Sequence, residues 1–194
     1  ANPLATPSGK LEIWSDTIAG FDYDDCPGHA TWLEPVEWLG ADLAKTYPLH
    51  LISNQPASRL HSQLDNGIIA QEAKVAGREA VTLHPDDAAA RNIKDGDVVR
   101  LFNDRGECLA GAVISDGISP GIVQLPTGAW YDPTRPGQTG SLDKHGNPNI
   151  LTRDAGTSSL AQGPTAHSCL VEVEVYEGKP SPITAFRPPR MENR

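Results

Sequence analysis

The sequence lacks both a segment long enough to cross a membrane and any cluster of basic residues. No stretch approaches the roughly 18 consecutive apolar residues of a transmembrane helix, although 38% of the 194 residues are apolar. Aspartate and glutamate outnumber lysine and arginine by 25 to 16, which gives a formal net charge of −9. A nucleic-acid backbone needs cations on its protein partner to replace its counterions. We therefore expect neither membrane insertion nor a nucleic-acid partner.

Cysteine is scarce, and its three residues lie far apart. Cys26, Cys108 and Cys169 are odd in number, so at least one thiol stays unpaired and a disulfide framework is not expected. We expect all three to be packed or unreactive. Unpaired thiols favour the cytoplasm, with the periplasm as the alternative compartment. Residues 1–10 contain neither a basic nor a hydrophobic stretch, so we expect no signal peptide here and a chain that is a segment of a longer protein.

The usual phosphate-binding and catalytic motifs are also missing. No two glycines lie two positions apart, which excludes the dinucleotide fingerprint G-x-G-x-x-G. Gly106 and Gly111 have the spacing of a Walker loop, but Ala112 stands where that loop needs lysine. The six histidines never lie three or four residues apart, so we expect no zinc site built from this chain alone. The serines of residues 154–163 are interpreted as loop residues that bond nearby backbone groups, not as nucleophiles.

Glycine and proline, in contrast, are abundant. Together they make up 35 of the 194 residues, about 18% against roughly 12% in average proteins. Without low-complexity repeats, this excess indicates many tight turns and therefore a strand-rich fold. Apolar patterns predict short strands at residues 47–53, 79–84, 98–102, 107–115, 119–126 (with its turn) and 167–176. One short helix is predicted at residues 85–93, where Pro85 suits the first turn and Asn92 can end it in the left-handed region.

These elements predict a mainly β fold, a small barrel of about six strands with a few short helices and long loops. Too few helices are predicted to cover both faces of a doubly wound parallel sheet. Residues 1–46 are interpreted as an extended lead-in, in which residues 9–15 form a plausible strand and residues 29–48 a covering segment or short helix. We assign residues 47–178 to the barrel and residues 179–194 to an extended C-terminal tail.

Two stretches are polar but almost uncharged. Residues 52–67 (ISNQPASRLHSQLDNG) follow a predicted strand, and residues 145–163 (HGNPNILTRDAGTSSLAQG) precede the last one. Two explanations fit: solvated loops, or loops that hold a large polar ligand through amide, hydroxyl and guanidinium groups. Backbone amides in such loops can hold a pyrophosphate without any net positive charge. Composition alone does not separate the two explanations.

Six motifs occur in a characteristic order: NPLATPSGKLEIWS, YPLHLISNQPASRLHSQ, HPDDAAARNIKDGDVVRLFNDRG, SPGIVQLPTGAWYDP, HGNPNILTRDAGTSSLAQG and LVEVEVYEG. They resemble the C-terminal region of molybdopterin oxidoreductases of the dimethyl sulfoxide reductase family, closest to the biotin sulfoxide and trimethylamine N-oxide reductases. The resemblance covers nearly the whole chain and is most specific in SRLHSQLDNG and NPNILTRDAGTSSLAQG. It implies a six-stranded double-psi β-barrel that binds bis(molybdopterin guanine dinucleotide), the molybdenum cofactor.

The resemblance also implies a set of cofactor contacts in and beside the two polar stretches. They are Ser53, Asn54, Gln55, Ser58, Arg59, His61, Ser62, Gln63, Asn147, Asn149, Thr152, Gln162 and His167. Arg59 is the best candidate for a phosphate or a pterin carbonyl, and Asn149 for an amide that faces a pterin. Trp130 and Tyr131 either line the funnel to the metal or pack against each other.

In this group of enzymes, the protein ligand to molybdenum is generally a serine from an earlier segment, and nothing here matches that segment. The chain is therefore expected to contribute no catalytic or metal-ligating residue and to be inactive by itself. The complete bacterial oxidoreductase would reduce an S-oxide or N-oxide, such as biotin or methionine sulfoxide, trimethylamine N-oxide or dimethyl sulfoxide. The expected partners are the remaining domains of the same enzyme and this small-molecule substrate. The alternative is a stand-alone barrel that serves as a non-catalytic binding or assembly module.

Overall fold

The computed structural model describes residues 2–188. Within this range the chain forms two compact units, the first made of residues up to Pro35 together with Asp154–Thr165, and the second of Val36–Arg153 together with the residues from Ala166 onward. The division proposed from the sequence, at residues 1–46, 47–178 and 179–194, stays a prediction. Residues 189–194 of the predicted tail lie outside the described residues.

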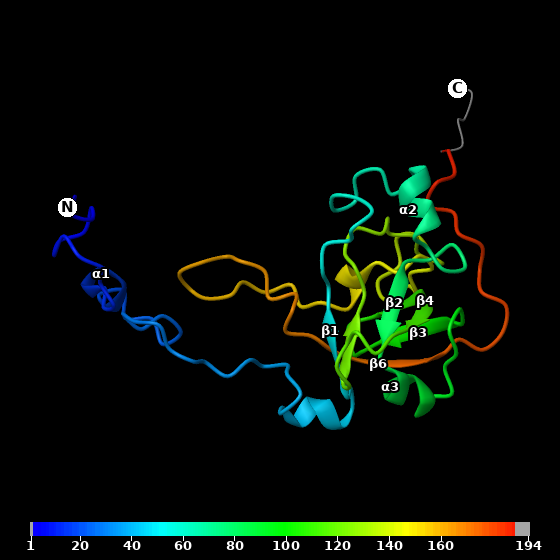
Figure 1. Cartoon of the computed structure of the whole chain (residues 1–194), viewed down its shortest axis with the longest axis horizontal. Helices are drawn as coiled ribbons and strands as arrows, with labels where there is room; N and C mark the ends of the chain where they lie inside the picture. The colour runs from blue at the N-terminus through cyan, green and yellow to red at the C-terminus, as the bar shows by residue number, and fades with distance from the viewer. Residues whose placement is uncertain (1, 189–194) are drawn as a thin grey trace. The chain divides into compact units, whose positions relative to one another are not determined.

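The second unit is a barrel (Figure 1). Among the described residues, six strands close into it in the order β1-β5-β2-β4-β3-β6. The strands are β1 (Leu49–Ile52), β2 (Ala80–Leu83), β3 (Val98–Phe102), β4 (Glu107–Ile114), β5 (Ile122–Gln124) and β6 (Leu170–Val175). Each lies inside a segment for which the apolar pattern predicts a strand, so the mainly β fold is confirmed.

Strand pairing in the barrel repeats after three strands. β1 pairs in parallel with β5 and antiparallel with β6, and β4 pairs in parallel with β2 and antiparallel with β3. The antiparallel pairs β2–β5 and β3–β6 map onto themselves when every strand number shifts by three. A closed six-stranded barrel with this internal two-fold relation and two parallel pairs is a double-psi barrel, which confirms the predicted fold.

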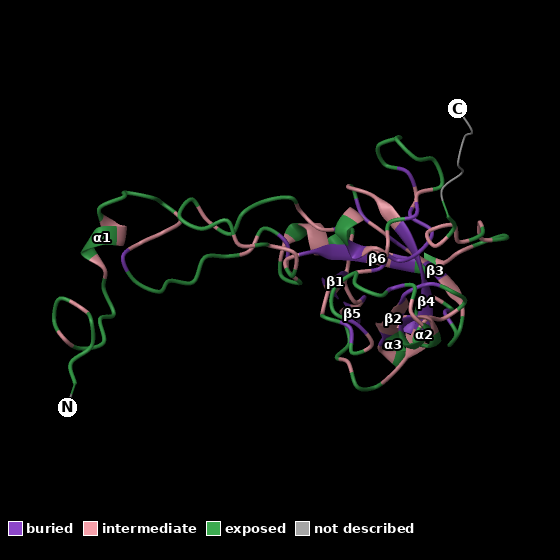
Figure 2. Cartoon of the chain, turned by 90° about the horizontal axis from the view of Figure 1, so that it is seen from above, coloured by how far each residue is buried: buried purple, intermediate pink, exposed green. Residues whose placement is uncertain are grey.

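Alternating residues of the strands fill the barrel. Side chains at every second position point to the same face of a strand, and the inward positions hold Leu49, Leu51, Val81, Leu83, Val99, Leu101, Val123, Val171 and Val173. Burying one such side chain stabilises the fold by about 1.5–3 kcal/mol. In Figure 2 the buried residues accordingly follow the barrel strands. β4 is buried on both faces from Cys108 to Ala112, because the segment around Asp143 covers its outer face.

Short helices connect the strands. They are α1 (Asp16–Ala19), η1 (Asp42–Lys45), α2 (Ile68–Glu72), α3 (Pro85–Ala89) and η2 (Pro148–Ile150). α3 begins at Pro85, as predicted, and the His84 ring accepts the Asp86 N–H at 3.1 Å. Asn92 adopts φ +56°, which confirms the left-handed residue predicted after this helix. Within residues 2–188, none of the helices combines the length and the apolar character that a membrane crossing requires.

The strand predicted over residues 9–15 is wrong. This segment has no regular structure, and the exposed fractions of Leu11 and Ile13 are 79% and 82%. A strand needs a neighbouring strand with which it exchanges backbone hydrogen bonds. The described residues form no such ladder with residues 9–15, although the Ser15 N–H donates to the Gly28 carbonyl at 2.7 Å. Ser15 instead caps α1 by accepting the Ile18 N–H at 3.3 Å.

All three cysteines are free. Cys108 and Cys169 are buried in the barrel, and burial raises the pKa of both thiols, that of Cys169 to about 11. A thiol with a raised pKa is a poor nucleophile at neutral pH. These two residues therefore act as core side chains.

Candidate functional site

A pocket of about 440 Å³ opens where the parallel strands β1 and β5 end. We name the segments around it the first loop (residues 53–67), the second loop (residues 125–132) and the third loop (residues 143–149). The pocket is lined by His61, Ser62, Thr127, Gly128, Ala129, Trp130, Tyr131, Asn147 and Asn149. Because β1 and β5 run in the same direction, the first two loops leave the barrel at the same end. Figure 1 shows this end beside α2, opposite α3.

The first and second loops are joined through their backbones. The Leu125 N–H donates to the Ile52 carbonyl at 3.0 Å, and the Thr127 N–H donates to the Asn54 carbonyl at 2.9 Å. Gly128 then adopts φ +97°, and a Cβ atom there would collide with the carbonyl oxygen of His61. Glycine is thus required where the second loop crosses the first.

The third loop is organised by one buried carboxylate. Asp143 Oδ1 accepts the Asp132 N–H at 2.7 Å, and Oδ2 accepts the N–H groups of Gly146 and Asn147, both at 2.8 Å. The His145 N–H donates to the same Oδ2 at 3.2 Å. Backbone donors that converge on one carboxylate fix the turn before η2. This turn places Asn147 and Asn149 at the pocket.

A balanced cluster of charges lies behind the first loop. Arg59 Nη2 lies 2.9 Å from Glu79 Oε2, and Lys74 Nζ lies 3.0 Å from the same oxygen. Lys74 Nζ also lies 2.8 Å from Asp65 Oδ1, and Arg59 Nε lies 3.4 Å from it. All four side chains are nearly or fully buried, so each charge depends on its partners for stabilisation.

His145 lies next to this cluster with a fully buried ring. Its Nδ1 is 2.8 Å from the Trp130 carbonyl oxygen and 3.8 Å from Asp65 Oδ2. Burial, and after it the positive charge of Lys74, lower the pKa of His145. The ring is therefore neutral at pH 7, with its proton on Nδ1, because only a protonated Nδ1 can donate to a carbonyl. Its Nε2 has no hydrogen-bond partner among the described residues.

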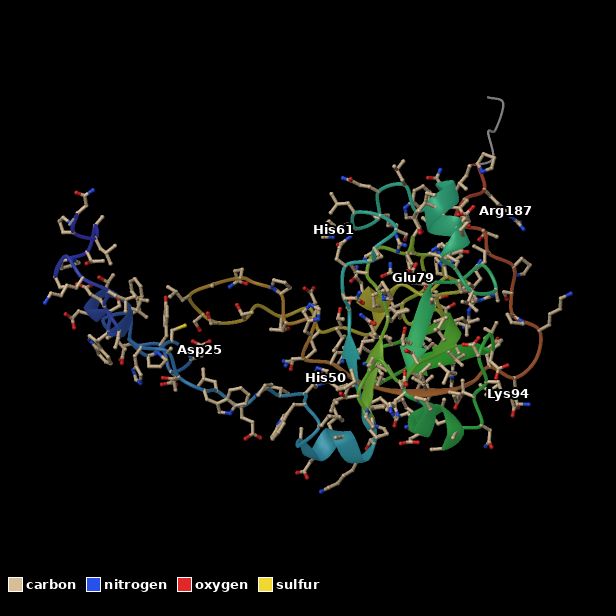
Figure 3. The ribbon with its side chains drawn as sticks, in the orientation of Figure 1. Asp25, His50, His61, Glu79, Lys94 and Arg187 are labelled. Carbon is tan, nitrogen blue, oxygen red and sulfur yellow. The ribbon has the colours of Figure 1, made fainter. Side chains whose placement is uncertain are left out.

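Several residues predicted from the sequence meet in the pocket. His61 and Ser62 come from the first loop, and Asn147 and Asn149 come from the third, more than 80 positions further along the chain. Figure 3 shows His61 on the loop after β1, at the pocket end of the barrel. The Asn147 side chain accepts the Asn149 N–H at 3.0 Å and so starts η2. The predicted contacts of these residues with a cofactor stay predictions.

Other predicted residues of the first loop support its shape. Gln55 Nε2 donates to the Arg59 carbonyl at 2.8 Å, and the Gln63 N–H donates to the Leu60 carbonyl at 2.9 Å. Asn54 Oδ1 is buried and has no hydrogen-bond partner among the described residues. Ser53 and Ser58 are half-buried in the same loop.

The remaining predicted contacts lie outside the pocket lining. Thr152 Oγ1 donates to the Asn149 carbonyl at 3.4 Å, just beyond η2. The His167 carbonyl lies 2.6 Å from His50 Nε2, beside the beginning of β6. Gln162 belongs to the first unit, in the hairpin closed by the bridge between residues 156 and 164.

Arg59 is buried next to the pocket loops and does not line the pocket. The exposed fraction of its side chain is 1%, and besides Glu79 it donates to the carbonyls of His61 and Thr127, both at 3.1 Å. The guanidinium thus orders backbone of the first and second loops. Direct contact of Arg59 with a phosphate or pterin stays a prediction, and in this structure its donors are used by protein acceptors.

Sequence reasoning missed Gly128, which lines the pocket, and five residues that shape it without lining it: Asp65, Lys74, Glu79, Asp143 and His145. The available signal was the pair Asp143 and His145 immediately before the polar NPN motif, in a stretch otherwise rich in glycine and proline. Charged side chains in such a stretch usually face solvent. Their burial follows from contacts with residues far away in the sequence.

Comparison with known proteins identifies the class of this domain. Residues 49–170 match the family described as "Molydopterin dinucleotide binding domain". The dimethyl sulfoxide/trimethylamine N-oxide reductase of Cereibacter sphaeroides is 51% identical over 189 residues, which cover 97% of this chain and 23% of that protein. Trimethylamine-N-oxide reductase 1 of Escherichia coli K12 is 53% identical over 184 residues, which cover 94% of this chain and 22% of that protein.

A solved structure shares the fold. Acetylene hydratase from Pelobacter acetylenicus superposes with a TM-score of 0.70 at 21% identity, over 90% of this chain and 24% of that one. The chain spans less than a quarter of the length of the curated relatives described above. It belongs to the molybdopterin dinucleotide-binding domain family, which confirms the predicted family and class of cofactor.

The pocket residues fit such a cofactor. A molybdopterin dinucleotide presents ring nitrogens, carbonyls and phosphates, and the pocket offers the amides of Asn147 and Asn149 and the hydroxyl of Ser62. The buried Asn54 Oδ1, without a partner among the described residues, is a further acceptor on the first loop. A buried polar atom without a hydrogen bond is costly, and a ligand donor would remove that cost.

Proposed function

We propose that the chain is the cofactor-binding domain of a molybdenum oxidoreductase that reduces S-oxides or N-oxides, and that its three-loop pocket binds part of bis(molybdopterin guanine dinucleotide). The observation that carries the proposal is that His61 and Ser62 of the first polar stretch and Asn147 and Asn149 of the second line one uncharged, hydrogen-bonding pocket. The identity of about half of the residues to enzymes named for dimethyl sulfoxide and trimethylamine N-oxide supports this substrate class.

Each loop has a distinct task in this proposal. The amides of Asn147 and Asn149 bind the hydrogen-bonding edge of a heterocycle, and His61 and Ser62 of the first loop hold other polar groups of the cofactor. When bound, the molybdenum centre supplies the oxygen-atom transfer and two-electron chemistry. The residues of this chain bind and orient that cofactor, and the remaining domains of the same enzyme supply the rest of the active site.

The test uses the full-length protein that contains this chain. Asn149→Ala removes an amide from the pocket, and Gln138→Ala makes the same kind of change at an exposed position outside it. We expect Asn149→Ala to lower the molybdopterin and molybdenum contents severalfold, and Gln138→Ala to leave both at the parent level. Reduction of trimethylamine N-oxide and dimethyl sulfoxide should fall in proportion to the cofactor that is lost.

Two results would reject the proposal. A parent protein without molybdopterin would favour a stand-alone binding or assembly module. A parent that holds the cofactor but reduces neither S-oxides nor N-oxides would keep the binding function and remove the substrate class.

A further inference from the structure

Trp130, on the second loop, is hydrogen-bonded to both neighbouring loops. Its backbone N–H donates to Asp65 Oδ2 at 2.9 Å, and its indole Nε1 donates to the Ser62 carbonyl at 2.8 Å. Its own carbonyl lies 2.8 Å from His145 Nδ1 on the third loop. We call these four residues, Ser62, Asp65, Trp130 and His145, the Trp130 lock.

Two polar side chains of the Trp130 lock are buried. Asp65 and His145 are fully buried, and Asp65 Oδ1 lies 2.8 Å from Lys74 Nζ and 3.4 Å from Arg59 Nε. The charged groups that face His145 are Lys74, Asp65 and Asp143. A hydrogen bond to a buried group is stronger than one at the surface, since less water competes for the donor.

The C-terminal segment around Thr184 and Phe186 packs against the Trp130 lock. The Phe186 ring packs edge-on against the His145 ring, with 5.0 Å between the ring centroids, and at a tilt of 53° against the Trp130 ring, with 5.3 Å between the centroids. Thr184 donates to the Asp132 carboxylate through both its N–H and its hydroxyl, which ties the segment to the end of the second loop. The predicted extended tail therefore packs on the barrel over these described residues.

We propose that His145 and Asp65 are positioning residues that act through Trp130 to hold the three pocket loops in the arrangement that the cofactor needs. This inference rests on the proposed function. A pocket whose hydrogen-bonding groups are fixed in advance loses less conformational entropy on binding. The lock provides that fixation between loops that are far apart in the sequence, and it should slow the release of the cofactor.

Three variants of the full-length protein separate positioning from general stability. His145→Leu removes the donor to the Trp130 carbonyl, whereas His145→Asn retains an amide N–H close to the position of Nδ1. Val173→Ala opens a cavity in β6, which is buried but does not line the pocket, and serves as a control of comparable thermal stability.

Two measurements are made on each variant. Hydrogen–deuterium exchange of residues 125–132 and 143–149 in the cofactor-free protein reports the lock without any ligand. The rate at which molybdopterin is lost during dialysis reports cofactor retention. We expect His145→Leu to exchange faster in both segments and to lose cofactor at least tenfold faster than Val173→Ala, and His145→Asn to stay within about twofold of the parent.

Each other outcome overturns a stated part of the inference. Exchange in His145→Leu no faster than in Val173→Ala would show that the lock does not hold the loops. Faster exchange with unchanged cofactor loss would show that the lock holds the loops but not the cofactor. A parent protein that contains no molybdopterin would overturn the proposed function, whereas the exchange measurement would still decide whether the lock exists.

Discussion

Arg105 and Glu37 form a two-pronged ion pair, with Nη1 2.7 Å from Oε1 and Nη2 2.9 Å from Oε2. Glu37 also accepts the Leu170 N–H at 2.8 Å, and Arg105 Nε donates to the Leu151 carbonyl at 2.8 Å. The pair therefore joins four segments: the chain before β1, the turn between β3 and β4, the end of η2 and the beginning of β6.

Breaking this pair should destabilise the barrel. Only 2% of the Glu37 side chain is exposed. Arg105→Met would leave Arg153, whose Nε lies 4.0 Å from Glu37 Oε1, as the nearest remaining cation, and should cost about 3 kcal/mol in the free energy of unfolding. The control is Lys45→Met, which breaks an ion pair with Asp42 whose side chains are 81% and 96% exposed and should cost less than about 1 kcal/mol. Urea unfolding of the chain measures both, and equal losses would contradict the role of the buried pair.

The charge balance behind the first loop predicts coupling between Asp65 and Lys74. Asp65→Asn leaves Lys74 and Arg59 with Glu79 as their remaining carboxylate, so we expect a loss of about 3–5 kcal/mol. Adding Lys74→Met removes the surplus cation, and the double variant should be more stable than the sum of the single losses predicts. Additive losses in a double-mutant cycle measured by urea unfolding would show that the two side chains do not interact.

Two glycines with similar backbone angles should respond differently to alanine. Gly128 and Gly137 have φ +97° and +80°, but a Cβ atom collides with the His61 carbonyl at the first and meets nothing within 4 Å at the second. Gly137→Ala should cost about 1–2 kcal/mol, from the left-handed backbone alone. Gly128→Ala should cost clearly more and should also weaken cofactor retention in the full-length protein. Similar unfolding midpoints for the two variants would mean that the first and second loops separate easily.

His145 predicts a stability that depends on pH. Because burial lowers the pKa of the folded His145 below its ordinary value of 6.5, the unfolded chain takes up a proton there before the folded chain does. The contribution of neutral His145 is therefore complete above about pH 6.5 and declines as the pH falls below it, by up to ~1.4 kcal/mol per pH unit. His145→Asn should remove this decline. Parallel stability curves for parent and variant between pH 7 and pH 5 would contradict the prediction.

Most of the barrel could be predicted from the sequence because its signal is local. Alternating apolar residues mark β3 and β6, and Asn103–Gly106 supply the residues of the turn between β3 and β4. These local patterns do not predict the order of the strands, because the parallel pairs β1–β5 and β2–β4 join segments that are separated in the sequence by whole strands. The segment 9–15 shows the converse: its alternation is local, but none of the strands in residues 2–188 pairs with it.

The candidate site likewise contains residues that a local pattern identifies and residues whose burial depends on distant contacts. The two polar stretches were identifiable because they contain amides and hydroxyls where a core would need apolar side chains, and His61 and Asn149 do meet in one pocket. Burial of Arg59 could not be predicted, because its partner Glu79 lies 20 positions away and becomes its neighbour only when the barrel closes. A single charged residue in a polar loop gives the same local pattern whether it faces a ligand or the protein interior.

The internal two-fold relation of the barrel has a consequence for how many ligands it can hold. The shift by three strands maps the pocket end, where β1 and β5 finish, onto the end where β4 and β2 finish. At that equivalent end α3 follows β2 directly, and Asp87 accepts the Gly121 N–H at 2.7 Å. The two halves of the barrel therefore differ at their equivalent ends: one carries the helix α3, and the other carries the loops that form the pocket. Building a second ligand pocket at the end of β2 and β4 would first require the replacement of α3.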